Sequence, residues 1–209
     1  MTNTPLEFCH LALWCDDLER ASRTFEEETG FTPLEGGRHE RPGTWNKLCG
    51  AGSNSYVELI AKDPDRDLNE LMRQMISGHP NLAPCVVAFK HTDLEAFAEH
   101  AKGCGVQPIG PFTLSRIGED GSEVFFDALA LQHPEYRLPA ILDWKDVPHP
   151  SQLLGDGVKI IEVNAVSPDP EGLSALLNHL NIPLPVKQSE RQGFSARIEG
   201  PSGTLETAQ

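Results

Sequence analysis

The feature that most constrains the fold of this chain is one local pattern that occurs three times. Asp17, Asp93 and Asp169 lie 76 residues apart (17 to 93, 93 to 169), and each is followed two positions later by a glutamate. An apolar, strand-like run precedes each aspartate and a helical pattern follows it. Helix capping alone explains an aspartate at such a position. Because the flanking strand recurs as well, we favour duplication of a structural unit.

The three copies predict an α+β fold in a single domain spanning residues 1–209. Residues 6–62 and residues 84–145 each follow the order strand, helix, strand, strand, strand, which is a βαβββ module. Residues 67–77 between them predict a connecting helix. A partial third copy over residues 158–209 contains a strand and a helix followed by a hairpin.

Composition excludes several classes of partner. The net charge is −14, so the chain gains nothing from counterion release on DNA or RNA, and we expect no nucleic-acid partner. The five cysteines contain no CxxC pair, which favours reduced thiols. The first residues show no signal-peptide pattern and no apolar run is long enough to span a membrane. We therefore expect a cytoplasmic protein that binds no membrane, and composition leaves open whether it is monomeric or homodimeric.

Four segments resemble a known family when they are taken in order. They are CHLALWCDDLERA, EGGRHERPGTWN, SYVELIA and LPAILDWKDVPHP. Together they resemble the glyoxalase-like branch of the vicinal-oxygen-chelate superfamily, also called the glyoxalase/bleomycin resistance/dioxygenase fold. The resemblance implies repeated βαβββ modules whose curled mixed sheets enclose a cavity, which in that superfamily often holds a divalent metal. Trp45 stands where relatives usually have histidine.

Three side chains could hold such a metal. His10 and Glu58 lie in the middle of predicted strands, and Asp143 corresponds to Glu58 by its position in the second module. One histidine and two carboxylates suit Zn, Mn or Fe, with open positions for substrate oxygens. The position that corresponds to His10 in the second module is Val86, so the ligand set is incomplete there. A His10 that hydrogen-bonds Glu58 without any metal is the alternative.

The GGRH–GTWN segment supplies the candidate substrate-binding residues. Arg38 could bind a substrate carboxylate or phosphate, or be an exposed loop arginine. His39 could be an acid–base group beside a catalytic Glu58, because its pKa is ordinarily near neutral. Asn46 could orient a substrate carbonyl or cap a loop. Trp45 could line the cavity or belong to the core.

Other polar residues are assigned structural places. Arg116 could face the cavity from the second module, but a solvated strand end is the favoured interpretation, and His149 is expected in a proline-flanked turn. Cys9 is expected to be a small buried hydrophobe and not a nucleophile.

These residues support two main functions. The first is a metal-dependent isomerase, lyase or dioxygenase acting on a small oxygen-rich metabolite. The second is a metal-free protein that binds or sequesters a small molecule, which Trp45 and Val86 favour. A scaffold that acts through dimerisation is a third possibility.

Overall fold

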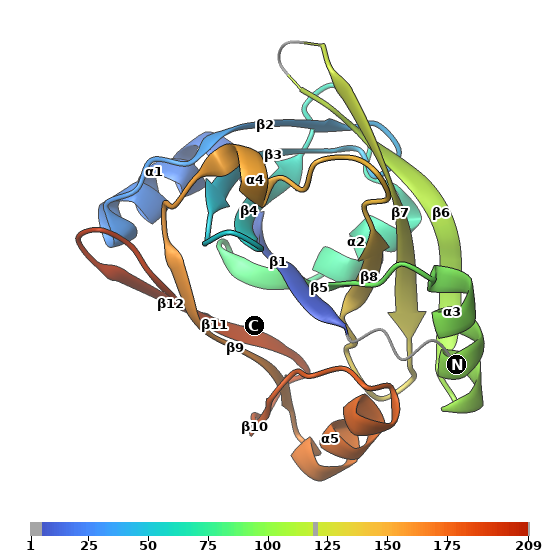
Figure 1. The fold of residues 1–209 in the computed structure, drawn as a ribbon. Helices are drawn as coiled ribbons and strands as arrows, with labels where there is room; N and C mark the ends of the chain where they lie inside the picture. Colours follow the sequence, from blue (N-terminus) through green and yellow to red (C-terminus); the bar gives the residue numbers. More distant parts are fainter. Residues whose placement is uncertain (1–5, 119–120, 209) are drawn as a thin grey trace.

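Eight strands form a closed barrel in the computed structural model, which describes residues 6–118 and 121–208 (Figure 1). Around the barrel the strands follow the order β1-β4-β3-β2-β6-β7-β8-β5. Barrels of eight strands have an interior wide enough for side chains or one small ligand. The elements of the first half are β1 (Glu7–Cys15), α1 (Leu18–Thr29), β2 (Leu34–His39), β3 (Thr44–Gly50) and β4 (Tyr56–Lys62). Those of the second half are β5 (Ala83–Lys90), α3 (Leu94–Gly103), β6 (Gln107–Ile117), β7 (Glu123–Gln132) and β8 (Ala140–Asp143).

The two halves have the same internal strand order. In each half the first strand pairs in parallel with the fourth, and the third and second strands follow. Antiparallel β1–β5 pairing joins the halves on one side, and a β2–β6 pairing joins them on the other. The predicted α+β fold with curled sheets around a cavity is confirmed.

The three recurring aspartates are the N-caps of three helices. Asp17 and Asp93 each accept a hydrogen bond from the backbone N–H three residues later, at the starts of α1 and α3. Asp169 does the same for α5 (Pro170–His179). These bonds satisfy N–H groups that a helix start leaves without partners. The predicted connecting helix is shorter than expected: α2 (Glu70–Ile76) starts after Asn69, whose side chain caps it.

The last part of the chain forms a second sheet outside the barrel. Its strands are β9 (Lys159–Ser167), β10 (Val186–Gln188), β11 (Gly193–Glu199) and β12 (Thr204–Ala208), and a short α4 (Ser151–Leu154) precedes them. The order is β10-β9-β11-β12, so β9 pairs in parallel with the strand directly after its helix. This differs from the barrel halves, where the first strand pairs with the fourth. The sheet packs on β5 and α1 (Figure 1).

Alternation along the strands separates an outer core from the barrel interior. Leu11 and Leu13 of β1 point outward and are fully buried in a core shared with the helices and the second sheet. His10 lies on the other face of β1 and points into the barrel, as does Glu58 of the paired strand β4. Side chains two residues apart share a face of a strand, so each barrel strand contributes to both layers. Among the described residues, no helix combines the length and apolarity needed to cross a membrane.

Candidate active site

The barrel encloses a cavity of about 420 Å³ with one polar wall and one apolar wall. The volume lies within the range of small-molecule sites in proteins. Its polar wall comes mainly from the first half: His10, His39, Asn46, Tyr56 and Glu58. Its apolar wall comes mainly from the second half: Val86, Phe112, Leu114, Phe126, Ala128, Leu142 and Trp144.

Glu58 is the centre of the polar wall. Its Oε1 accepts a hydrogen bond of 2.5 Å from Asn46 Nδ2, and its Oε2 lies 3.4 Å from His10 Nε2. The amide oxygen of Asn46 accepts from the backbone N–H of Gly37 at 2.8 Å, which fixes which end of the amide faces Glu58. The carboxyl group is therefore held in one orientation at the cavity wall.

Burial shifts the ionisation of this group and its partner. Burial raises the pKa of the Glu58 carboxyl above its ordinary value, while the Asn46 hydrogen bond and the positive charge of Arg116 act in the opposite direction. Burial lowers the pKa of His10 to about 3, with the nearby His149 and His39 contributing. His10 is therefore neutral at pH 7 and acts as a hydrogen-bonding partner of Glu58, not as a counter-ion.

A buried chain of polar groups continues behind His10. His10 Nδ1 lies 3.4 Å from Cys9 Sγ, and Cys9 Sγ lies 3.2 Å from His149 Nε2. His149 Nδ1 in turn lies 2.7 Å from Ser151 Oγ. Burial raises the pKa of Cys9 to about 12, so this thiol stays protonated, in line with its predicted inert role. His149 lies in the proline-flanked turn expected for it, and its ring also contacts Cys9 and Tyr56 behind the wall of the site.

His39 and Arg116 lie on the side of the cavity where β2 and β6 meet. His39 Nδ1 is 3.1 Å from Thr44 Oγ1, and burial lowers the pKa of His39 to about 4, with the charge of Arg116 contributing. Arg116 follows Phe112 and Leu114 at two-residue spacing, and all three line the cavity. The favoured placement of Arg116 at a solvated strand end was therefore wrong. Strand alternation from Phe112 and Leu114 could have predicted that Arg116 faces the cavity.

Arg38 and Trp45 lie outside the set of residues that line the cavity. Arg38 makes an ion pair with Asp63 and lies 3.3 Å from Asp65. Its guanidinium also stacks over the ring of Trp45, 5.5 Å from the ring centre. Both residues alternate with inward-pointing neighbours, His39 and Asn46, so the structure places them on the outer face of the barrel wall.

The proposed metal ligands are only partly brought together. His10 and Glu58 meet, but Asp143 is not among the cavity-lining residues, and its Oδ1 accepts from the backbone N–H of Lys145 at 2.8 Å. The inward neighbours of Asp143 along this segment are the apolar Leu142 and Trp144. Within residues 6–118 and 121–208, no group of three His, Cys, Asp or Glu side chains is arranged to hold a metal ion. The donor set therefore does not fit a divalent ion bound by three protein ligands.

Comparison with known proteins places the chain in a family. Residues 8–181 match the model of the glyoxalase-like domain. No curated protein matches the chain.

Solved structures share the fold at low sequence identity. A hypothetical protein from Staphylococcus aureus matches with a TM-score of 0.66 and 17% identity, covering 97% of this chain and 86% of that one. A methylmalonyl-CoA epimerase, solved with methylmalonyl-CoA and NH4+, matches with a TM-score of 0.51 and 18% identity over 70% of this chain and all of that one. A Streptomyces coelicolor methylmalonyl-CoA epimerase variant in complex with 2-nitronate-propionyl-CoA matches with a TM-score of 0.50 and 18% identity, covering 69% of this chain and 98% of that one. The barrel of two equivalent halves and the match over residues 8–181 together show that this chain belongs to the glyoxalase-like domain family.

Proposed function

We propose that the barrel cavity binds a small, largely apolar molecule with an oxygen-bearing end, and that Glu58 moves a carbon-bound proton of that molecule. One observation carries the proposal: a buried carboxyl group is fixed by Asn46 and a neutral His10 at the wall of the barrel cavity. This arrangement supports an isomerase or lyase that starts with proton abstraction next to a carbonyl.

Glu58 suits the role of an acid–base group because of where it lies. A buried carboxylate is poorly solvated, so it gains more from accepting a proton than an exposed one does. Its raised pKa brings it closer to the working pH, where a group can act as base in one step and acid in the next. The hydrogen bond from Asn46 acts in the opposite direction and limits how far burial raises the pKa of Glu58.

The rest of the cavity fits a ligand with two chemically different ends. Phe126 and Trp144 stack on each other, 4.6 Å between ring centres, and offer an apolar surface. Arg116 of β6 lines the same cavity, and its positive charge would stabilise negative charge on a carbonyl oxygen as the proton leaves. Arg116 already acts electrostatically on Glu58 and His39, so its charge is felt at the site.

The extent of the apolar wall supports a second candidate, a metal-free protein that binds a small molecule without transforming it. In this case Glu58 serves only as a hydrogen-bonding group for the ligand. The two candidates differ in one property, namely whether Glu58 acts as a base.

The test uses 5-nitrobenzisoxazole, a small aromatic probe. A base removes its C3 proton, the N–O bond breaks, and a coloured phenolate with a nitrile is released. We expect the protein to accelerate this reaction and Glu58→Gln to reduce the rate at least 100-fold. Glu70 lines the same cavity but is largely exposed in α2, so Glu70→Gln is the matched control and should keep the rate.

Binding is measured separately with 1-anilinonaphthalene-8-sulfonate, an aromatic anion that fluoresces in apolar surroundings. We expect Glu58→Gln to bind this probe and Ala128→Trp, which fills the apolar wall, to lose it. Probe binding without any rate that depends on Glu58 would favour the binding protein over the enzyme.

A further inference from the structure

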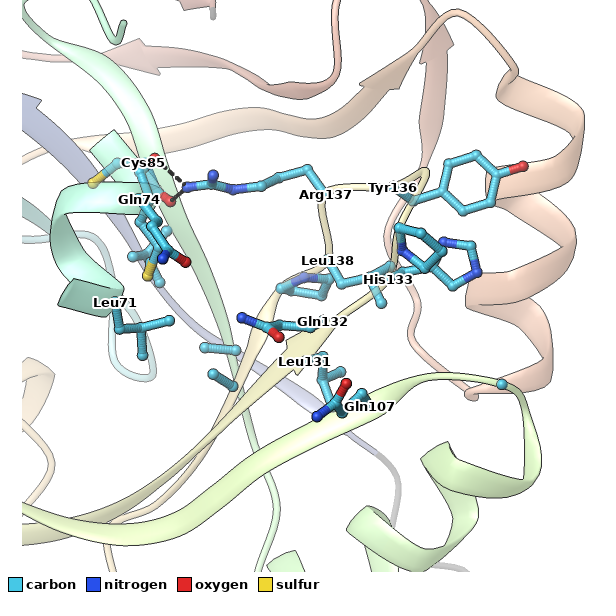
Figure 2. A pocket seen from close by; sticks show the side chains of 17 residues that line it. Leu71, Gln74, Cys85, Gln107, Leu131, Gln132, His133, Tyr136, Arg137 and Leu138 are labelled. Carbon is cyan, nitrogen blue, oxygen red and sulfur yellow. Dashed lines mark hydrogen bonds between the residues drawn. The ribbon is translucent and has the colours of Figure 1, made fainter. Parts of the chain in front are cut away.

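A second pocket lies beside the barrel cavity and shares a wall with it. Its volume is about 520 Å³, and it is shown in Figure 2. Five residues line both spaces: Leu71, Met75, Val86, Ala130 and Ala140. All five are apolar side chains of the kind that contact an alkyl chain, and two of them, Leu71 and Met75, come from the short helix α2.

Arg137 is the charged group of this second pocket. It is held in place by a backbone bridge between the strand end at Gln132 and its own segment. Its Nη2 donates to two backbone carbonyls, Met75 at 2.8 Å and Cys85 at 2.9 Å (Figure 2). A guanidinium has five N–H donors, so three of them, on Nε and Nη1, are left for a ligand.

The surroundings of Arg137 leave its charge without a counter-ion. No Asp or Glu is among the residues that line the pocket, although the whole chain carries 31 acidic residues against 17 basic ones. Among the described residues, no carboxylate lies within 4 Å of the Arg137 guanidinium. Burial lowers the pKa of Arg137, but an arginine stays protonated at neutral pH. A cation that is largely removed from water and unpaired is stabilised when an anion binds beside it.

The other polar groups of the pocket are neutral and can assist. Gln74, Gln107 and Gln132 line the pocket and are labelled in Figure 2. Amide N–H groups donate to anions without adding charge of their own.

We infer that this second pocket is the anion-binding end of the barrel site, where Arg137 takes the carboxylate of an elongated ligand. The inference rests on the proposed function for the other end of that ligand. Its apolar stem passes the shared wall of Leu71, Met75 and Val86, and its reacting end lies beside Glu58. The ligand class is therefore a molecule with a terminal carboxylate joined by an apolar chain to a second, oxygen-bearing group.

The test compares decanoate with decan-1-ol, which has the same chain length and no charge. We expect the protein to bind decanoate about tenfold more tightly, and decanoate to displace 1-anilinonaphthalene-8-sulfonate competitively, because a ligand that passes the shared wall would occupy both spaces. Arg137→Gln should remove the preference for decanoate without changing the affinity for decan-1-ol. Arg23→Gln removes the same charge from the exposed face of α1 and should change neither.

A second variant guards against a folding defect in Arg137→Gln, which loses two backbone contacts. Gln132→Glu keeps the size of the side chain and adds a negative charge to the pocket, so the preference for decanoate should fall.

Equal affinity of the unmodified protein for decanoate and decan-1-ol overturns the inference, and so does decanoate binding that leaves the fluorescent probe in place. If Arg137 governs decanoate binding while the proton-transfer rate ignores Glu58, the proposed function fails and the anion site stands. The reverse pattern keeps the function and removes the anion site.

Discussion

The two halves of the barrel share one topology but have different interiors. In the first half, inward positions on β1, β3 and β4 carry His10, Asn46 and Glu58. In the second half, the inward positions of β5 and β8 include Val86 and Leu142. The first half therefore supplies most of the polar groups and the second half most of the apolar wall, with Arg116 as a polar group of the second half. Strand pairing uses the backbone, so a duplicated barrel can keep its fold while the inward side chains of one copy change freely.

The largest expected effect is acid destabilisation caused by histidines that are buried neutral. His10, His39 and His149 have pKa values of about 3, 4 and 4, and among the described residues of the second half no histidine lines the cavity. The unfolded chain takes up these protons near pH 6.5, so it binds more protons than the folded state below that pH, and stability falls as the pH falls. Between pH 6.5 and 5 each residue should contribute a loss of about 1.5 kcal/mol.

Urea denaturation at several pH values measures this loss. In His39→Gln the fall in the free energy of unfolding between pH 6.5 and 5 should be about one third smaller. If the unfolding free energies at the two pH values were equal, the histidines would not be buried neutral.

The next effect concerns the apolar wall. Phe126 of β7 is buried and stacks on Trp144, so Phe126→Ala should cost about 3–5 kcal/mol and weaken binding of 1-anilinonaphthalene-8-sulfonate. Its neighbour Phe125 points to the other face and is half exposed, so Phe125→Ala should cost under about 1 kcal/mol and leave probe binding unchanged. Thermal or urea unfolding and fluorescence titration give both values. If the two variants lost probe affinity to a similar extent, the cavity wall would not be where the probe binds.

A smaller effect is expected in the polar wall. Asn46→Ala leaves Glu58 Oε1 and the Gly37 N–H without their partner, at a cost of about 1–3 kcal/mol. The Asn46 hydrogen bond lowers the pKa of Glu58, so its removal should raise that pKa further. The rate with 5-nitrobenzisoxazole should then rise with pH over a higher range than in the unmodified protein. Asn54→Ala, at an exposed loop position, is the control, and an unshifted pH profile in Asn46→Ala would argue against Glu58 as the base.

The smallest effect is expected at Asp143, the residue whose position in the second module corresponds to that of Glu58 in the first. Because its carboxylate bonds to the Lys145 backbone outside the cavity lining, Asp143→Asn should change stability by less than about 1 kcal/mol. The proton-transfer rate should also survive both this substitution and dialysis against EDTA. A rate lost on EDTA treatment and restored by Zn²⁺ would show that His10 and Glu58 use a metal after all.

The fold was predictable because local and repeated signals agree. The aspartate N-caps act through bonds to residues three positions away, and the alternating apolar strands fix which face is buried. The pairing of His10 with Glu58 was open to prediction as well, since both lie mid-strand in one module and β1 pairs with β4.

The tertiary structure decided whether residues in loops and at strand ends point into the cavity or away from it. Sequence places Arg38 and His39 side by side, but a strand sends neighbours to opposite faces, so one meets Asp63 outside and the other lines the cavity. His149 and Cys9 lie 140 positions apart and meet only because β1 passes the segment after β8. The sequence by itself determined the repeated unit, the helix starts and the buried strands, since these depend on neighbours along the chain. Closure of the barrel decided which polar groups share the cavity, because that depends on register between strands distant in sequence.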